Sequence, residues 1–511
     1  MEPNHARVQL SQTDASRYPG PVLALLKRLN RPVYAVIAVA AIAGGLRFAR
    51  LDSPPERAFD ELYYSEAACI LLGESNETCF VDTDDERYWR REKWDVGSWV
   101  HPPLGKWMIA LGEKAFGVTP FGWRFSAAVA GTLSCVFLAM TAQVLWRKPL
   151  WTFVAGLLLA TEHLNFVLSR LSLLDIFLAF WVVLGFLFLA LDHRWIERDQ
   201  PEPPEPDADG QVPPPPKPPS PVWRPWRYTA GAAFGAAIST KWAGAYALVA
   251  AVIISYAWET TRRRKSDRLP LLRAFLIETF PMLLAFLVVP IAVYMVTYLP
   301  WFNHFGWSLG AWWDNQRGIF RFHWNLHWYR LDQTTSTYTP THPYLSRAWS
   351  WLAVWRPVLI FSRYDGDRVR WITATGNIAI FWGSAFTLPF AAWMWRRARD
   401  WTAGFVLVGF LVQYLPWFFI SRPQFFFYMA PMTPMLVLAA TYAVRELSEA
   451  RLVLRAEDGS TVASTRPAYR PIAIGFVVLS VFMFAWFYPV LSGMDISKTW
   501  WRAIVWFRGW A

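Results

Sequence analysis

The sequence predicts an all-α polytopic membrane protein with about eleven transmembrane helices and two large outward-facing loops that carry short amphipathic helices. Of its 511 residues, 54% are hydrophobic and only 17% are charged, against roughly a quarter charged in soluble domains. The hydrophobic residues form long blocks that approach the ~20 residues needed to cross a bilayer. Clusters of Lys and Arg stand between alternate blocks, as the positive-inside rule requires.

Eleven apolar segments are expected, and the fifth and sixth of them are short. These two are read either as two spans or as one bent helix broken near Lys241. A single span would place the cluster Arg262–Lys265 outside, so the charge bias favours two. The segments are 32–49, 123–146, 149–165, 171–192, 228–241, 243–258, 275–299, 372–395, 401–420, 425–445 and 471–489.

This topology puts the N-terminus in the cytoplasm and divides the chain into seven regions. No cleavable signal peptide is evident, so the first span is expected to remain as an anchor. Because the net charge of +12 is accounted for by the inside loops, nucleic acid is not an expected partner. The regions are a cytoplasmic segment (1–31), a transmembrane module with the first outer loop 50–122 (32–192), a Pro-rich cytoplasmic linker (193–227), a transmembrane region (228–299), a second outer loop (300–371), a C-terminal transmembrane module (372–489) and an outer tail (490–511).

Two of these regions have an unusual composition. The second outer loop holds nine Trp between Trp301 and Trp355, and Trp prefers the membrane interface, so this loop is expected to lie on the membrane. The linker holds eleven prolines from Pro201 to Pro221, which favours an extended spacer. Cys69 and Cys79 share the first outer loop; the sequence leaves open whether they pair, which an oxidising compartment would permit.

The first outer loop carries the strongest candidates for chemistry. Asp60 and Glu61 follow the first span, and a carboxylate there suits a general base that activates a hydroxyl. Taken alone, the acid pair fits a solvated loop or a helix N-cap better than it fits a general base. The run from His101 to Lys106, His-Pro-Pro-Leu-Gly-Lys, is more specific: two prolines fix a turn, and Lys106 near the start of a short amphipathic helix could meet a phosphate.

Several cations are expected at outer helix ends, against the positive-inside bias. Charged groups at membrane depth are costly and usually functional, so these cations suggest an anionic ligand such as a lipid phosphate, while snorkelling toward headgroups is the alternative. Asp175, one turn below Arg170, is expected to pair with Arg170 or another of these cations, in a structural or a catalytic role. The cations are Arg124, Arg170, Lys241 and Arg422.

The segment from Thr341 to Arg347, with His342, is a candidate to close over a site. His323 and His327 stand four residues apart, but no acid lies suitably between them for zinc. The absence of P-loop, GxGxxG, CxxC-pair and HExxH sequences argues against nucleotide hydrolysis, redox chemistry and zinc peptidases.

Taken in order, these motifs resemble the protein O-mannosyltransferases. The shared elements lie between about residues 45 and 445, and the resemblance is closest to the actinobacterial members. They are Asp-Glu after the first span, the His-Pro-Pro-Leu-Gly-Lys run, Leu-Ser-Arg with Leu-Leu-Asp (168–175), Ser-Thr-Lys-Trp-Ala-Gly (239–244), and His-Pro with Ser-Arg (342–347).

The resemblance implies a GT-C fold, a bacterial cell-membrane location and an active site on the outer side. It implies inverting transfer of mannose from polyprenyl-phosphate mannose to Ser or Thr of secreted proteins, with the secretion translocon as a further partner. Asp60 would be the base, Glu61 its partner in acceptor binding, and Arg124 functionally important. Together with Arg170, Lys241 and Lys106, Arg124 would bind the donor phosphate. No cofactor besides the lipid-linked sugar is expected; whether a divalent metal takes part is left open.

Two other functions are weighed. A relative of the same fold could glycosylate a cell-wall glycan or a lipid instead of protein. A transporter would place ionisable groups near mid-membrane, often in two related halves; here the cations lie at helix ends and no repeat is evident, which argues against transport.

Overall fold

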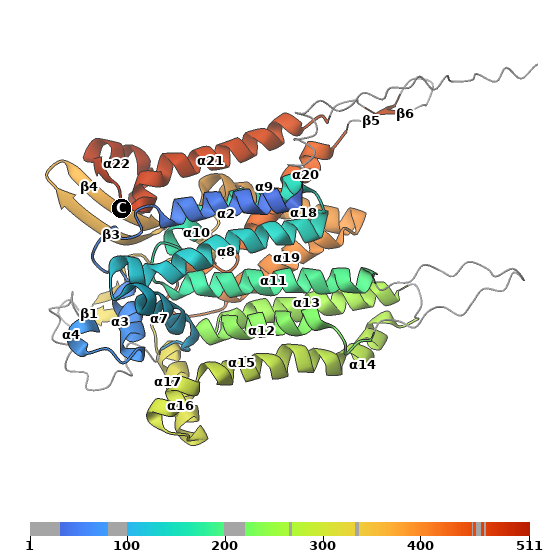
Figure 1. Ribbon diagram of the computed structural model, residues 1–511. Coiled ribbons are helices and arrows are strands. Elements are labelled where there is room, and N and C mark those ends of the chain that lie inside the picture. Colours follow the sequence, from blue (N-terminus) through green and yellow to red (C-terminus); the bar gives the residue numbers. More distant parts are fainter. Residues whose placement is uncertain are drawn as a thin grey trace, which may run out of the picture.

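The chain folds into a bundle of long helices with a layer of shorter elements at one end (Figure 1). The computed structural model describes residues 31–79, 100–198, 220–264, 268–332, 337–451, 453–455, 461–463 and 467–510. Within these ranges, six helices are long and apolar enough to cross a membrane by length and composition. They are Pro120–Trp146, Leu174–Glu197, Pro270–Thr297, Ile378–Ala398, Trp401–Phe418 and Arg470–Ser492.

Each of the eleven expected apolar segments contains a helix, while the number that cross the membrane stays a prediction. Two segments are interrupted: one is split between α9 and α10, and another has a π-helical turn between α14 and α15. The bundle consists of α2 (Pro32–Phe48), α8 (Pro120–Trp146), α9 (Pro149–Ala160), α10 (His163–Leu168), α11 (Leu174–Arg198), α12 (Pro225–Thr240), α13 (Gly244–Arg263), α14 (Pro270–Leu283), η1 (Leu284–Val288), α15 (Val289–Thr297), α18 (Ile378–Ala398), α19 (Trp401–Tyr414), η3 (Leu415–Phe418), α20 (Thr433–Glu449) and α21 (Arg470–Ser492).

The break near Lys241 is confirmed. Helix α12 ends at Thr240 and α13 begins at Gly244, with Lys241 in an extended conformation between them. Gly244 lies so close to the preceding helix that an added Cβ would be 2.6 Å from the carbonyl carbon of Ala237. A side chain at this position would therefore force the two helices apart, and the tight turn holds Lys241 at the end of the bundle.

Both large loops and the C-terminal tail lie at that same end of the bundle (Figure 1). The opposite end carries the α13–α14 connection, the C-terminal end of α20 and a two-stranded hairpin, β5 (Val453–Arg455) with β6 (Thr461–Ala463). The loop elements are α3 (Glu61–Leu71), α4 (Asn76–Cys79) and α7 (Leu104–Phe116) in the first loop; α16 (Leu299–Phe305), α17 (Leu309–Trp324), β1 (Tyr329–Asp332), β2 (Thr337–Pro340), η2 (Ala348–Ser350), β3 (Val358–Asp365) and β4 (Arg368–Ala374) in the second; η4 (Phe426–Met429) before α20; and β7 (Asp495–Ser497), α22 (Lys498–Ile504) and η5 (Arg508–Trp510) in the tail.

A three-stranded antiparallel sheet in this layer was not expected from the sequence. Its order is β3-β4-β7, with Val369 opposite Ile496. The apolar segment predicted from residue 372 therefore starts in a strand, and its helix begins only at Ile378. Buried Val369, Trp371 and Ile372 explain the error, because a short apolar run does not distinguish a strand from the start of a helix.

Candidate active site

Asp60 and Glu61 lie at the start of α3, and the structure gives them different surroundings. The Glu61 side chain is fully buried. Its carboxylate accepts from Ala58 N (2.9 Å), from Arg124 Nε (2.9 Å) and Nη2 (2.7 Å), and from Ser172 N (2.9 Å) and Oγ (3.3 Å). With both oxygens engaged, Glu61 has no free acceptor for a substrate, and it joins α3 to α8 and to the α10–α11 turn.

Arg124 has no N–H left for a ligand. Besides the two bonds to Glu61, its guanidinium donates to the carbonyl oxygens of Leu51 (3.3 Å), Pro54 (2.6 Å) and Glu56 (3.0 Å). These bonds use all five guanidinium N–H groups. This arrangement differs from the expected role of Arg124 as a ligand of the donor phosphate. Arg124 instead holds the loop that leads to Asp60.

Arg170 is also committed to protein acceptors. Its Nη1 donates to the carbonyls of Arg47 (2.9 Å) and Ala49 (2.5 Å), and its Nη2 to that of Arg50 (2.9 Å). Arg47 is in the last turn of α2, and Ala49 and Arg50 follow its last residue, so Arg170 caps the C-terminal end of this helix. Arg170 therefore serves the protein chain at the end of α2, but unlike Arg124 it keeps an Nε that donates no hydrogen bond within the described residues.

Lys106 fixes the turn of the His-Pro-Pro-Leu-Gly-Lys run. Its ammonium donates to the carbonyl oxygen of His101 at 2.7 Å, and the side chain is buried at 1% exposure. Burial lowers the pKa of Lys106 to about 7. Lys106 is not among the residues that line the nearby cavity, so it is not placed to bind the donor phosphate as expected. His101 does line the cavity.

A cavity of about 610 Å³ opens at this end of the bundle, between the starts of α11 and α13, helix α17 and the α19–α20 connection. Two of the predicted cations line it. Lys241 donates to Asp175 Oδ2 at 2.7 Å, so Asp175 pairs with Lys241 and not with Arg170. Arg422 donates from Nη2 to the Tyr428 hydroxyl at 2.8 Å, and its buried Nε has no hydrogen-bond partner within the described residues.

His323 of α17 connects Arg422 to the first outer loop. Its Nε2 lies 2.8 Å from the carbonyl oxygen of Val100, and its Nδ1 lies 3.1 Å from Arg422 Nη1. The carbonyl requires the proton on Nε2, so Nδ1 accepts from the guanidinium. Burial, followed by the charge of Arg422, lowers the pKa of His323 to about 4. Because both ring nitrogens of His323 are engaged, neither is free to bind zinc together with His327.

Asp60 is not among the residues that line this cavity, but it lies close enough to two that do, Lys241 and Asp175, for their charges to act on it. Burial raises the pKa of Asp60 to about 6; the Lys241 charge lowers it and the Asp175 charge raises it. The preceding residue, Phe59, has φ +57°, a conformation that is rare for a bulky side chain. Its ring contacts that of Phe427 at 5.9 Å. Asp60 makes no ion pair within the described residues, and its carboxylate lies within electrostatic reach of one cation, Lys241.

The segment 341–347 does not reach the cavity lining. His342 packs against Phe59 (ring centroids 6.4 Å apart) and Phe425 (5.0 Å), so it supports the residue next to Asp60. Arg347 is exposed and lies over the Trp328 ring at 4.9 Å. Sequence reasoning missed Tyr428 and the Arg422–His323 contact, because neither has a local motif to mark it.

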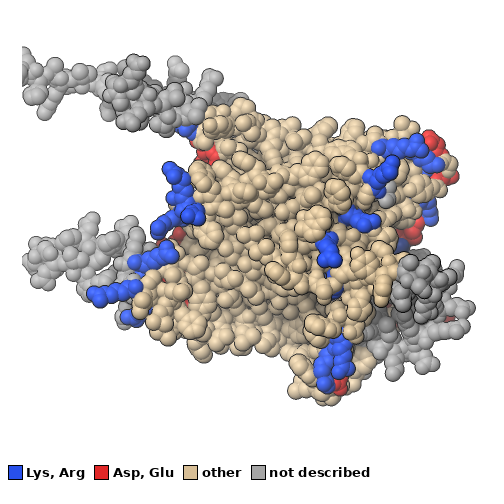
Figure 2. Space-filling model, turned by 180° about the vertical axis from the view of Figure 1, so that it is seen from behind, with Lys and Arg blue, Asp and Glu red and all other residues tan. Residues whose placement is uncertain are grey.

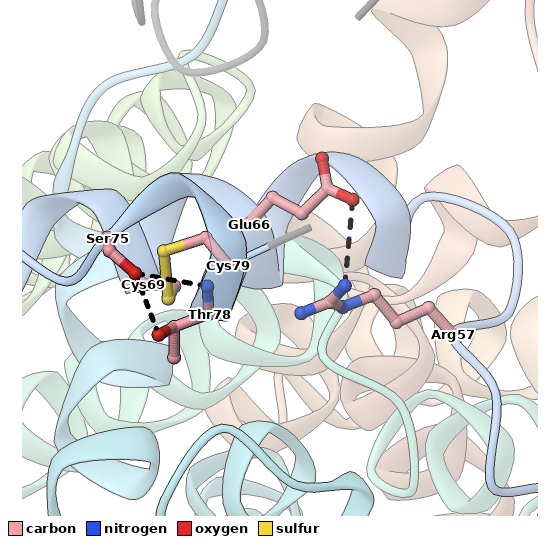
Figure 3. The surroundings of a disulfide bond; sticks show 6 residues. All are labelled: Arg57, Glu66, Cys69, Ser75, Thr78 and Cys79. Carbon is pink, nitrogen blue, oxygen red and sulfur yellow. Dashed lines mark hydrogen bonds and ion pairs between the residues drawn. A yellow bond between two sulfur atoms is a disulfide. The ribbon is translucent and has the colours of Figure 1, made fainter. Parts of the chain in front are cut away.

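The disulfide left open by the sequence is formed. Cys69, near the end of α3, bonds to Cys79 of α4 (Figure 3). In the same loop, Arg57 lies 3.6 Å from Glu66, and both are buried. These contacts fasten α3 to the chain on either side of it and thereby fix its first residues.

The fold is shared with structures of sugar-transferring membrane enzymes. The chain superimposes on the S. cerevisiae protein O-mannosyltransferase Pmt1-Pmt2 complex with a TM-score of 0.70, 13% identity and coverage of 97% and 96% of the two chains. Against apo ArnT from Cupriavidus metallidurans the TM-score is 0.50, with 19% identity over 81% and 60%. The protein is therefore a polytopic membrane protein of the GT-C fold, the fold of lipid-dependent glycosyltransferases.

Sequence comparison defines the family. Residues 37–306 match the model of dolichyl-phosphate-mannose-protein mannosyltransferases, and residues 319–510 match the C-terminal four-TMM region of protein-O-mannosyltransferases. The polyprenol-phosphate-mannose–protein mannosyltransferase of Mycolicibacterium smegmatis is 31% identical over 92% of both chains, and that of Corynebacterium glutamicum is 27% identical over 96% of both. The chain belongs to the dolichyl-phosphate-mannose-protein mannosyltransferase family and is a protein mannosyltransferase, as its motifs predict.

Proposed function

We propose that this enzyme moves mannose from polyprenyl-phosphate mannose to Ser and Thr hydroxyls of proteins that emerge on the outer side of a bacterial cell membrane. The observation that carries the proposal is a cavity lined by two cations, Lys241 and Arg422, with the carboxylate of Asp60 within electrostatic reach of Lys241. The names of the relatives supply the donor class. The N-terminus is then cytoplasmic, and the end of the bundle with both large loops faces outward.

The reaction is a single displacement with inversion. Asp60 takes the proton of the acceptor hydroxyl as its oxygen forms a bond to the anomeric carbon. The bond between that carbon and the phosphate oxygen breaks, and the lipid phosphate leaves with one more negative charge. Lys241 and Arg422 stabilise this charge, because both cations are already in place before it develops.

Five further residues position these three groups, and two of them, His323 and Tyr428, are not among the residues predicted to form the site. Asp175 holds the ammonium of Lys241, and His323 and Tyr428 hold the guanidinium of Arg422. Glu61 and Arg124 fix the loop and helix that carry Asp60. In this proposal the cavity cations replace Arg124, Arg170 and Lys106 as the phosphate ligands.

Replacing the base tests the proposal. Asp60→Asn keeps the shape but removes the proton acceptor, so transfer to a Ser/Thr peptide in membranes supplied with polyprenyl-phosphate mannose should fall by about 10²-fold or more. The matched control is Asp52→Asn, since Asp52 is an exposed acid of the same loop. Near-normal transfer by a well-expressed Asp60→Asn enzyme would remove Asp60 from the base role. Transfer to a glycan or lipid but not to peptides would favour the alternative acceptor class.

A further inference from the structure

A large groove lies at the opposite end of the bundle from the candidate active site. It has a volume of about 1450 Å³ and runs between the ends of α11, α13 and α18 and the starts of α14 and α19. Pockets for small ligands usually measure ~300–1,000 Å³. The groove is therefore large enough for a ligand with long chains, and no step of the proposed transfer reaction uses it.

One side of the groove is apolar and open. Ile253 of α13 and Leu269, Leu271 and Leu272 at the start of α14 line it, and their exposed fractions are 43%, 64%, 65% and 50%. Large exposed apolar patches mark contacts with a membrane, a ligand or another protein, and in a membrane protein the hydrocarbon of the bilayer supplies such a contact. The groove thus opens toward the acyl chains of the bilayer.

The deep wall of the groove is aromatic and rigid. The His193 ring stacks on Trp258 at 4.2 Å and meets Trp401 edge-on at 4.1 Å. Trp258 is also parallel to Phe405, with ring centroids 5.9 Å apart. Tryptophan favours the depth at which headgroups meet hydrocarbon, so this wall lies at the level of a lipid headgroup.

The rim of the groove is basic. Arg264, just after α13, and Arg399, just after α18, are exposed, and neither side chain makes an ion pair in the part of the chain that the structure describes. Two acids also line the groove, but both are already neutralised: Glu259 by Arg224, Arg262 and Arg263, and Glu197 by Arg194 and His193.

The face of the molecule drawn in Figure 2 agrees with this setting. Figure 2 shows that Lys and Arg gather toward the ends of the molecule, while the flank between them is mostly uncharged. Arg264 follows α13 and Arg399 follows α18, and both line the same groove. This arrangement suits a single phosphate held between two guanidinium groups.

We propose that this groove binds an anionic diacyl phospholipid, whose phosphate lies between Arg264 and Arg399 and whose acyl chains lie against α13 and α14. The bound lipid joins α13–α14 to α18–α19. Both parts also line the candidate active site at their other ends, through Lys241 and Arg422. The proposal does not depend on the transfer reaction, because it concerns binding alone.

The test compares lipid binding to the purified full-length protein by native mass spectrometry, with phosphatidylglycerol and phosphatidylcholine of the same chains as probes. Arg264→Ala with Arg399→Ala should reduce phosphatidylglycerol occupancy at least five-fold. The control is Arg396→Ala with Arg397→Ala, which removes the same charge from exposed residues of α18 that are not in the groove lining. It should leave occupancy unchanged.

Three outcomes would overturn the proposal. Equal losses of phosphatidylglycerol occupancy in both double variants would mean that the lipid is attracted by the positive charge of this end of the protein in general and not by the groove. Equal binding of phosphatidylglycerol and phosphatidylcholine to the wild type would mean that the arginines select no headgroup. Displacement of phosphatidylglycerol by undecaprenyl phosphate at a tenth of its concentration would mean that the groove belongs to the polyprenyl lipid. All four substituted arginines are exposed, so both variants are expected to fold, which size-exclusion elution checks.

Discussion

His323 and Arg422 share a hydrogen bond, 3.1 Å from Nδ1 to Nη1, in which the imidazole is the acceptor. The ring can accept only because its other nitrogen faces the Val100 carbonyl at 2.8 Å. His323, in the second large loop, thereby orients Arg422 of the cavity while it contacts Val100 of the first loop. Neither loop alone would hold the guanidinium in this orientation.

His323→Ala should therefore lower kcat/KM for mannosyl transfer by up to about 10²-fold, because a misplaced cation stabilises the leaving phosphate less well. Arg422→Ala should cost about 10²–10³-fold. If His323 acts through Arg422, the double variant will be no slower than Arg422→Ala. His327→Ala is the control and should be near normal, since His327 lies beyond the end of α17. Additive losses in the double variant would contradict the coupling.

The pH dependence of transfer should report Asp60. Its pKa is raised to about 6 by burial, and the base is competent only when it is deprotonated. kcat/KM is therefore expected to be constant well above pH 6 and to fall about tenfold per unit below it. His323, with a pKa near 4, stays neutral across this range. The residual activity of Asp60→Asn should not follow this profile; an unchanged profile in that variant would assign the titration to another group.

Removing Arg124 should damage stability more than it damages substrate binding. Arg124→Ala leaves the fully buried Glu61 carboxylate without its cation, a change that typically costs about 3–5 kcal/mol. Arg124→Lys should rescue little, since an ammonium cannot reproduce the two-pronged contact. The measurement is the thermal unfolding midpoint in detergent together with protein yield.

The matched control for Arg124 is Arg363→Ala. Arg363 pairs with Glu56 at 2.8 Å, but its side chain is 57% exposed, and exposed pairs contribute only about 0–1 kcal/mol. A stable Arg124→Ala protein with a strongly raised KM for the donor would restore the phosphate-binding role that the sequence suggests.

Charge and hydropathy were sufficient to predict the helices and the break at Lys241, because both features are local. They also brought Asp60, Asp175, Lys241 and Arg422 to one end of the bundle. They did not separate cations that face a ligand from cations that serve the fold. Arg124 and Arg170 have the same sequence signature as Lys241, but loop and helix-end carbonyls lie within their reach, and those acceptors are set by tertiary packing.

The sheet escaped prediction for a related reason. Strand β7 pairs with β4 across more than a hundred residues, so its three residues carry no pattern of their own. The same holds for His323, whose partners Val100 and Arg422 lie far from it in the sequence. Residues 201–219 of the Pro-rich stretch lie outside the described residues. The extended form of this stretch therefore stays a prediction.

The disulfide gives a direct test of which side the first loop faces. The chain has three cysteines: Cys69 and Cys79 are bonded, and Cys135 is free and buried. Disulfides persist in oxidising compartments, so protein purified from cells without reductant and then denatured should take up a maleimide reagent at one cysteine only. Reduction before denaturation should raise the number to three. Cys135→Ser is the control: it should show no labelled cysteine without reduction and two after it. Three labelled cysteines in the unreduced wild type would place this loop, and with it Asp60, on the reducing side of the membrane.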